Sequence, residues 1–411
     1  MVMKRTITLV IAYVYVLLAQ AQSSLVAKDG VLDARGHDFT HASLSLNGEW
    51  EFFNNQLVDP FQTTEKAVFA EFPYHWNESK SQGFGTFRIK VVVDKNLSTM
   101  SLDIPQLYSA YTLWVNETLI ANNGIVGTDR KSTEPQWLPQ VVSFKAGVDT
   151  LTITLQIANF YHSIGGAKNP IYLGLPEKLA TTQQTAHLVN TILLSVLTFL
   201  GIFFLSIYVF AKREKSALYF ALLCLTWALR SVFSEQYLAI HWMPWFDWEL
   251  GVKIEYLTLY LTMAWAISFI AHLYPMDTND LVKRILFYPN FLFVFVTLAT
   301  PALLYTRFLD VYLILAGALI LYAVVVILRA MLFERYGAWF SVMGVISLVA
   351  AFAYNYLSYQ GIFEFSPLTF YTSYLVFFFF LSIALAYQLS PKAGERNYSE
   401  SLSLEDVMAK K

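Results

Sequence analysis

The chain has 411 residues, of which 56% are hydrophobic and only 14% are charged. Soluble domains usually carry about 25% charged residues, so this composition indicates a membrane protein. The formal net charge of −2 argues against a nucleic-acid partner, which needs a basic patch or stripe. The single cysteine, Cys224, excludes an internal disulfide framework and a metal site of the cysteine type.

The first residues have the pattern of a secretory signal. Lys4 and Arg5 precede an apolar stretch over residues 6–18, and the Ala-Gln-Ala sequence at 19–21 fits the small-residue cleavage rule. The apolar stretch is shorter than the about 20 residues that a membrane span needs. We therefore expect a signal peptide over residues 1–21 and an exported segment from residue 22. An uncleaved anchor helix is the alternative.

Residues 22–180 show the period-two pattern of half-buried strands. Phe87, Ile89 and Val91 alternate with polar neighbours, and residues 151–157 repeat the pattern. Clusters of turn-forming residues separate such segments, and no long amphipathic helix interrupts them. About 150 residues of short strands are typical of a β-sandwich. We predict an all-β, jelly-roll or galactose-binding-like domain over residues 22–180.

The region 187–390 is almost continuously apolar and aromatic. It divides into segments that are each near the length needed to cross the about 30 Å hydrocarbon core. We therefore predict an α-helical bundle of seven transmembrane helices. The expected spans are 187–211, 216–240, 251–274, 285–304, 308–330, 337–358 and 367–389.

Basic residues sort to one set of span ends. Lys283, Arg284, Arg329 and Arg335 lie at those ends, whereas the opposite loops are acidic, with Arg307 as the main exception. The positive-inside rule places the basic ends in the cytoplasm. Seven crossings then put the N-terminal domain outside, which agrees with the signal sequence. We expect a bacterial inner-membrane protein with a periplasmic N-terminal domain and a short cytoplasmic tail over residues 391–411.

Three tryptophans lie in the connection between the second and third spans. Trp242, Trp245 and Trp248 are predicted to form an interfacial aromatic belt. The alternative is that they contact the sandwich. The sequence thus leaves open whether this connection faces lipid or protein.

Catalytic motifs are missing from the sequence. It contains no His-Glu-x-x-His motif, no Gly-x-Ser-x-Gly motif and no phosphate-binding glycine loop. The seven histidines lack the spacing of metal ligands. We therefore expect no enzymatic activity, no metal and no cofactor.

Several motifs of the first domain resemble the sugar-binding jelly roll at the front of β-galactosidase-type glycosidases. These motifs are Leu46-Asn47-Gly48-Glu49-Trp50, Phe84-Gly85-Thr86-Phe87-Arg88, Ala110-Tyr111-Thr112-Leu113-Trp114-Val115-Asn116 and Gln156-Ile157-Ala158-Asn159.

Over residues 30–390 the chain resembles more closely the bacterial seven-transmembrane receptors with diverse intracellular signalling modules. The matching segments include His75-Trp76-Asn77, Tyr108-Ser109-Ala110-Tyr111, Asn159-Phe160-Tyr161-His162, Ala228-Leu229-Arg230-Ser231 and Leu273-Tyr274-Pro275. The resemblance implies a sensory receptor that binds a carbohydrate-like or other small polar ligand. Such receptors usually continue into a signalling enzyme, and residues 391–411 show no catalytic motif. We therefore expect a separate cytoplasmic signalling partner, and the alternative is that the chain is a remnant of a longer receptor.

The candidate ligand residues follow from this resemblance and from the aromatic and amide side chains of the domain. Flat rings cover the apolar faces of sugars, and amides or arginine bond their hydroxyl groups, in line with the general make-up of ligand pockets. Core packing is the alternative use of the same aromatics. The residues that we select are Trp76, Arg88, Asn116, Asn159 and His162.

Four charged residues near the outer ends of the second and third spans form a second candidate site. They are Arg230, Glu235, Lys253 and Glu255. A charge in a span costs about 2.5–3.5 kcal/mol on insertion scales, so pairing is expected. We predict that Arg230 and Glu255 form an ion pair that couples the sandwich to the bundle. The alternative is that these groups extend to the membrane surface.

Two other functions compete with a receptor. A membrane-anchored carbohydrate-binding module without signalling would need no charge inside the bundle. A transporter is less well supported, because the sequence shows neither clear internal repeats nor broken helices.

Overall fold

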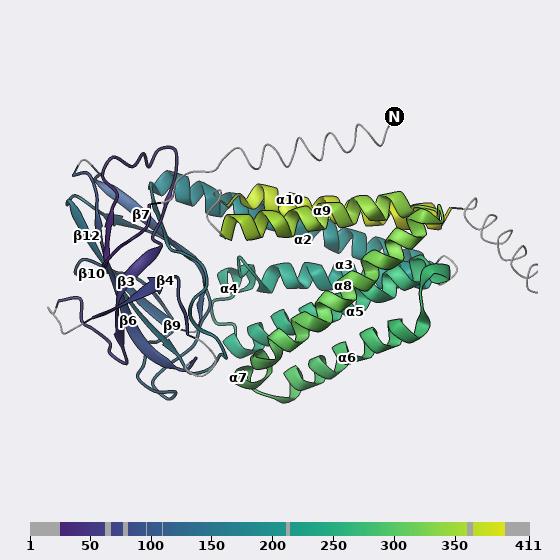
Figure 1. Cartoon of the computed structure of the whole chain (residues 1–411), viewed down its shortest axis with the longest axis horizontal. Coiled ribbons are helices and arrows are strands. Elements are labelled where there is room, and N and C mark those ends of the chain that lie inside the picture. The colour runs from purple at the N-terminus through teal and green to yellow at the C-terminus, as the bar shows by residue number, and fades with distance from the viewer. Residues whose placement is uncertain are drawn as a thin grey trace, which may run out of the picture.

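The computed structural model describes residues 25–61, 67–76, 81–95, 97–108, 110–210, 214–359 and 365–390. The expected signal peptide (1–21) and tail (391–411) lie outside the described residues. So do Asn77 and Ser109 of the family motifs. A domain of strands sits at one end of a long helical bundle (Figure 1), and we call it the β-domain.

The described strands form three sheets. In the large sheet the spatial order is β10 (Thr118–Asn123), β9 (Ala110–Val115), β12 (Thr150–Asn159), β6 (Gly83–Val92), β3 (Gly48–Asn54) and β4 (Val68–Phe72), with β1 (Val31–Asp33) parallel to β6. A four-stranded sheet has the order β11 (Gln140–Lys145), β7 (Thr99–Ile104), β14 (Tyr172–Gly174) and β2 (Leu44–Ser45). The smallest sheet has the order β5 (His75–Trp76), β13 (Gly165–Ala167) and β8 (Leu107–Tyr108).

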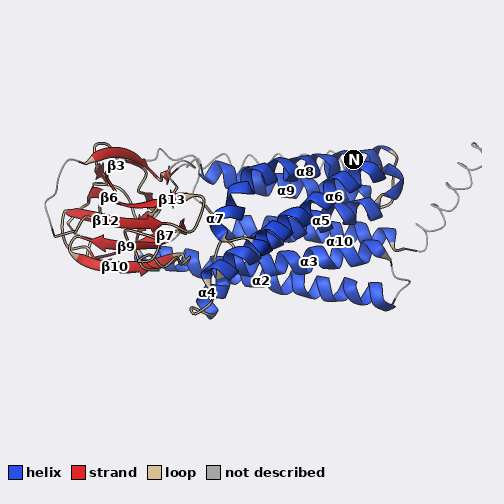
Figure 2. Ribbon diagram, turned by 90° about the horizontal axis from the view of Figure 1, so that it is seen from below, coloured by secondary structure: helices blue, strands red, loops and turns tan. Residues whose placement is uncertain are grey.

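The period-two pattern fixes which face of each strand is buried. Phe87, Ile89 and Val91 on β6 are fully buried and belong to one core with Leu102 on β7 and Leu173 on β14. Because this core joins residues of the large and the four-stranded sheets, the two sheets pack face to face as a sandwich. The predicted β-sandwich is confirmed, and Figure 2 shows its strands gathered at one end of the molecule.

Helices make up the rest of the described chain. They are α2 (Pro176–Phe210), α3 (Lys215–Phe233), α4 (Leu238–Trp242), α5 (Trp248–Leu273), η1 (Pro275–Asp277), α6 (Asp280–Ala299), α7 (Ala302–Tyr305), η2 (Thr306–Phe308), α8 (Leu309–Leu332), α9 (Ala338–Tyr359) and α10 (Pro367–Gln388). Counting the stretch from α7 to α8 as one span, seven helices of the described chain are long and apolar enough to cross a membrane. This confirms the predicted seven-helix region.

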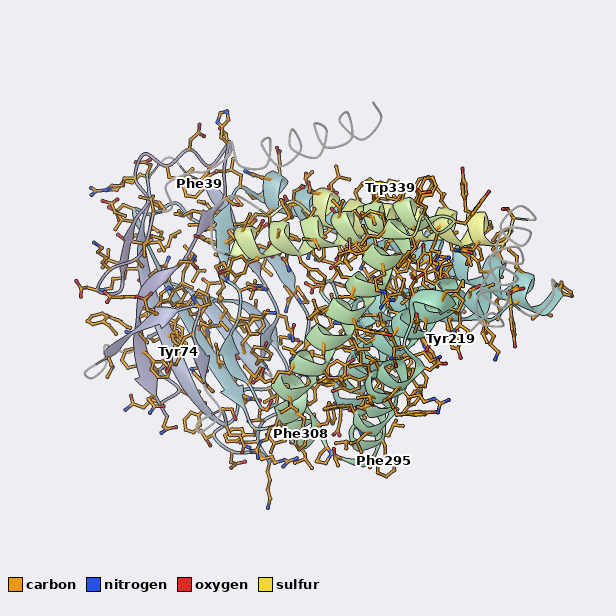
Figure 3. The ribbon with its side chains drawn as sticks, turned by 45° about the vertical axis from the view of Figure 1, so that its right-hand side comes forward. Phe39, Tyr74, Tyr219, Phe295, Phe308 and Trp339 are labelled. Atoms are coloured by element: carbon orange, nitrogen blue, oxygen red, sulfur yellow. The ribbon has the colours of Figure 1, made fainter. Side chains whose placement is uncertain are left out.

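The outside of the bundle is apolar. Phe295 on α6 and Trp339 on α9 are more than half exposed and lie on opposite sides of the bundle (Figure 3). Exposed aromatic and aliphatic side chains on every flank are unfavourable in water and match the hydrocarbon of a bilayer. The chain is therefore a multi-pass membrane protein.

The first helix begins earlier than its expected span. We expected a span from residue 187, whereas α2 starts at Pro176, a favoured first residue of a helix. Its first turns contact β7 and β11, and the Lys178 ammonium donates to the main-chain carbonyl of His41 at 2.6 Å. The polar start of α2 belongs to the β-domain surface, which is why hydropathy did not reveal it.

The second span is shorter than expected. We predicted a helix to residue 240, whereas α3 ends at Phe233. Glu235 and Tyr237 then adopt left-handed backbone conformations, with φ of 58° and 46°, and the short α4 follows. Left-handed conformations cannot continue a right-handed helix, so the chain turns here toward the β-domain.

Candidate functional site

The β-domain and the helices meet in a buried cluster of aromatic side chains, which we call the joint. Its members from the β-domain are Tyr108, Trp137, Tyr161 and His162, and those from the helical region are Tyr237, Trp248, Tyr256 and Tyr305. The β-domain members come from β8 and from the loops before β11 and β13. The helical members come from the α3–α4 turn, α5 and α7.

Trp137 lies at the centre of the joint and is only 4% exposed. Its ring packs edge to face against Trp248, with centroids 5.5 Å apart, and against Tyr237 at 5.7 Å. On the β-domain side it contacts the ring of His162 at 5.5 Å. Edge-to-face pairs add about 0.5–1.5 kcal/mol each beyond burial, so Trp137 holds both parts together.

Hydrogen bonds also cross the joint directly. The main-chain N–H of Ser163 donates to Thr306 Oγ1 at 3.1 Å, and the Tyr237 hydroxyl donates to Gln106 Oε1 at 2.6 Å. Burial raises the pKa of Tyr237 well above its usual range, which keeps the phenol protonated as a donor. The left-handed backbone at Tyr237 is a strained conformation for an aromatic residue, and its ring contacts compensate for this cost.

Asn159 organises the β-domain side of the joint. Its side-chain amide donates to the carbonyls of Ser81, His162 and Ile164 at 2.8, 2.8 and 3.1 Å. Its Oδ1 accepts from the main-chain N–H of Tyr161 and His162. One fully buried amide therefore fixes the loop that carries two aromatic members of the joint.

His162 is buried between rings. It stacks on Tyr108 with centroids 5.0 Å apart, and its Nδ1 accepts from the main-chain N–H of Ile164 at 3.0 Å. Burial lowers the pKa of His162 to about 4, so the ring is neutral at neutral pH. Within the described part of the chain its Nε2 is buried and has no hydrogen-bond partner.

Arg230 and Glu255 lie side by side, but in a different arrangement from the predicted side-chain ion pair. Arg230 Nη1 donates to the main-chain carbonyl of Glu255 at 2.8 Å. The carboxylate oxygen Oε2 of Glu255 is buried without a hydrogen-bond partner among the described residues. Arg230 of α3 thus binds a main-chain carbonyl of α5, next to Tyr256 of the joint.

The two other predicted coupling residues lie near the surface. Glu235 occupies the left-handed turn after α3. Lys253 pairs with Glu249 one turn earlier on α5, at 3.4 Å. The structure therefore brings Arg230 and Glu255 together and places Lys253 near the start of α5, at the β-domain end.

A cavity of about 320 Å³ lies at the edge of the joint. The β-domain contributes Pro135, Gln136 and Tyr161 to its wall, and residues 244–249 contribute the other side. Trp248 belongs both to this wall and to the joint, whereas Trp245 is 80% exposed at the rim. The three tryptophans of this connection thus divide between protein contact and an exposed position.

The remaining ligand candidates lie elsewhere in the β-domain. Trp76 belongs to the sandwich core. Asn116 forms the β9–β10 turn, with a left-handed φ of 55° and its Oδ1 accepting from the Thr152 N–H at 2.9 Å. Arg88 lies on the outer face of the large sheet, 5.0 Å from the centroid of the Phe53 ring. Only Asn159 and His162 of this set meet at the joint.

Sequence reasoning missed most of the joint. Trp137 carries no signal beyond its aromatic type, and Thr306 lies in an unremarkable polar position between two apolar helices. Their importance depends on contacts between segments far apart in sequence. One sequence feature indicated the turn at Tyr237: the polar run at 234–236 interrupts an otherwise apolar span.

Comparisons with known proteins extend this description. A search of curated proteins gave no match. Solved structures that resemble the chain include a Faecalibacterium prausnitzii β-glucuronidase (14% identity, TM-score 0.26, 32% of this chain and 31% of that chain). Others are a Ruminococcus gnavus β-glucuronidase (14%, 0.26, 33% and 29%) and an Eisenbergiella tayi GH2 β-galacturonidase (13%, 0.24, 33% and 24%). Each match covers less than a third of the solved chain and concerns the fold alone.

The helical region gives a more specific result. The family model described as 7TM diverse intracellular signalling matches residues 186–388, which hold the seven apolar helices except for the start of α2. Through residues 186–388, the chain belongs to the 7TM diverse intracellular signalling family.

Proposed function

We propose that the chain is a sensory receptor that binds a carbohydrate-like or other small polar ligand in the periplasm and signals through its helices to a separate cytoplasmic protein. The proposal includes no catalytic step. Its main support is the joint, in which one buried aromatic cluster contains side chains from the β-domain and from the membrane helices.

A passive anchor would not need such a joint. Trp137 is buried against Tyr237 and Trp248, and the bonds from Ser163 to Thr306 and from Tyr237 to Gln106 fix the orientation of the β-domain. A flexible linker would suffice for tethering. Rigid contacts convert a change in the β-domain into a change in α5 and α7, which is what signal transmission requires.

The distribution of charge supports the proposed orientation in the inner membrane. Lys283, Arg329 and Arg335 lie at the end of the bundle opposite the β-domain, where Arg335 pairs with Asp277 at 3.1 Å. Asp247 and Glu249 lie at the β-domain end. By the positive-inside rule the far end faces the cytoplasm and the β-domain faces the periplasm.

The experiment uses the full chain in lipid nanodiscs. Neutral monosaccharides and disaccharides are screened by thermal shift. A binder is then tested on the Cys224→Ser background with spin labels at Met276→Cys and Phe333→Cys, two exposed positions at the far end. We expect the binder to change the distance between the labels. A binder that leaves this distance unchanged supports the membrane-anchored binding module, and a panel without a binder contradicts the carbohydrate proposal.

A matched control separates transmission from binding. Trp137→Ala removes the central ring of the joint, whereas Trp242→Ala removes a half-exposed tryptophan of α4. We expect the far-end response to be lost in the first variant and kept in the second.

A further inference from the structure

The cavity at the joint has the size and position of a ligand site. Its volume of about 320 Å³ falls within the about 300–1,000 Å³ typical of small-molecule sites. Its wall combines Gln136 and Tyr161 of the β-domain with Asp247, Trp248 and Glu249 at the start of α5. A molecule bound there would touch both parts of the protein at once.

Hydrogen-bonding groups around the cavity are left without partners. Trp248 is 7% exposed, and its indole Nε1 has no hydrogen-bond partner in the part of the chain that the structure describes. The indole Nε1 of Trp137, in the adjoining ring, is in the same condition. A buried N–H without a partner costs about 1–3 kcal/mol, and native proteins satisfy most such groups. Both nitrogens are closed off from the cavity, so a polar ligand reaches them only by turning the rings.

The charges around the cavity select against ions. Asp247 and Glu249 are acidic, which disfavours an anion. Glu249 is already paired with Lys253 at 3.4 Å, and the Arg130 guanidinium lies 4.9 Å from the centroid of the Tyr161 ring. Lys253 thus balances Glu249, and Arg130 lies beside a ring of the wall, so the site gains little from a cation. An uncharged ligand fits this balance best.

The chemistry of the wall indicates which uncharged ligand. Trp248, Tyr161 and Phe246 supply flat apolar rings, the Gln136 side-chain amide can donate, and carboxylate oxygens accept. Asp247 uses Oδ1 to accept from the Leu250 N–H at 2.8 Å, which holds the carboxylate at the wall. Rings with hydroxyl rims match such a wall. Building on the proposed function, we propose that this cavity binds an uncharged, polyhydroxylated molecule of monosaccharide size.

This position gives binding a direct effect on the joint. Trp248 lines the cavity and packs edge to face against Trp137, with centroids 5.5 Å apart. A ligand that draws the Trp248 ring toward the cavity and bonds its Nε1 shifts this pair. The same contact that recognises the ligand thereby changes the attachment of the β-domain to α5.

The test measures binding to the full chain in nanodiscs by isothermal titration. The probes are D-glucose, D-galactose and D-mannose as neutral sugars, D-glucuronate as an anion and D-glucosamine as a cation. Trp248→Phe keeps a ring and removes the Nε1 donor, and Asp247→Asn removes a charge. We expect a neutral sugar to bind. We also expect Trp248→Phe to weaken binding by about 3–10-fold, the value of one hydrogen bond.

Two controls make the outcome decisive. Trp242→Phe changes a tryptophan of α4 outside the cavity, and Arg88→Gln changes the outer face of the large sheet; neither should alter binding. Loss of binding in Arg88→Gln with retention in Trp248→Phe would place the site on the sheet and overturn the inference, while the receptor proposal stands. Preferred binding of glucuronate or glucosamine would overturn the uncharged class. Failure of every probe overturns both the inference and the carbohydrate part of the proposed function, whereas a sugar whose binding Trp248→Phe and Asp247→Asn leave unchanged overturns the inference alone.

Discussion

A single amide, Asn159, carries more hydrogen bonds than any neighbour in its loop, which makes it a sensitive point of the β-domain. Asn159→Ala would leave several buried carbonyl and N–H groups near Ser81 and Ile164 unsatisfied. We expect a loss of about 2–4 kcal/mol in the free energy of unfolding, measured by denaturant titration of the full chain. Asn122→Ala, at an exposed position of β10, is the control and should change stability little. Equal effects of the two substitutions would contradict this role.

His162 makes the stability of the joint depend on pH. Its pKa in the folded protein is lowered to about 4 from 6.5 by burial. The unfolded chain therefore binds the proton first, so the contribution is fully present above pH 6.5 and is lost as the pH falls through 4. Between pH 6.5 and pH 4 we expect the free energy of unfolding to fall less in His162→Phe than in the wild type, by up to about 3 kcal/mol. Thermal unfolding at a series of pH values measures this difference.

The contribution of His162 is obtained by comparing variants with the wild type, because a second buried group also titrates between pH 4 and pH 6.5. Burial raises the pKa of Asp103 to about 6, so this group titrates in the same window with the opposite sign. Asn122→Ala removes no titratable group and should follow the wild-type curve. A His162→Phe curve that also follows the wild type would show that His162 does not titrate in this window.

At the residue scale the sequence predicted residue types better than roles. Asn116 and Asn159 are both amides at strand ends, and both were selected for ligand binding. In the structure Asn116 stabilises the β9–β10 turn, whereas Asn159 holds a buried loop in place. Amide chemistry is the same in each case, and only the surrounding carbonyls and N–H groups, which the sequence does not display, distinguish them.

At the scale of elements, close helix packing depends on Gly201. A Cβ at this position of α2 would lie 2.6 Å from Leu225 Cγ on α3, whereas a Cβ at Gly317 of α8 would meet no atom within 4 Å. Small residues permit such close approach in membrane helices. We expect Gly201→Ala to destabilise the bundle by about 1–3 kcal/mol and Gly317→Ala to stabilise it by about 0.5–1 kcal/mol. Thermal unfolding in nanodiscs measures both, and the same sign for the two would refute this account.

Periodicity predicted the elements well where burial alone shapes them. The alternation on β6 and β12 gave the correct buried face, and hydropathy gave the seven helices. It failed where a helix leaves the membrane. The start of α2 is polar because it covers a sheet, and α3 ends because Glu235 and Tyr237 turn the chain.

At the scale of the molecule, the bond from Ser163 to Thr306 is a test of rigid attachment. Thr306→Val keeps the shape of the side chain and leaves the buried N–H of Ser163 without its acceptor. We expect local opening to become easier by about 1–3 kcal/mol, seen as faster hydrogen exchange at Ser163. Thr300→Val is the control, because the Thr300 hydroxyl donates only to Val296 of its own helix. Unchanged exchange at Ser163 would mean that other contacts hold the β-domain.

Sequence reasoning named a possible contact of Trp248 with the sandwich but did not specify the hydrogen bonds that cross the joint. Ser163 and Thr306 are 143 residues apart, and Gln106 and Tyr237 are 131 residues apart. Each pairing depends on how two separately predictable parts dock. Composition and periodicity describe each part alone, so they do not specify which loops of the β-domain meet which helix ends.

The length of α2 has a mechanical consequence. Its 35 residues run without an internal proline from the four-stranded sheet to the far end of the bundle, as Figure 1 shows. At about 1.5 Å per residue it is a rod of about 52 Å, so a rocking of about 5° at the β-domain displaces the opposite tip by about 4–5 Å. Because α3 and α10 pack along this rod, they are carried with it. A tilt too small to alter the fold of the β-domain thus becomes, at the opposite end of the bundle, a displacement as wide as a side chain.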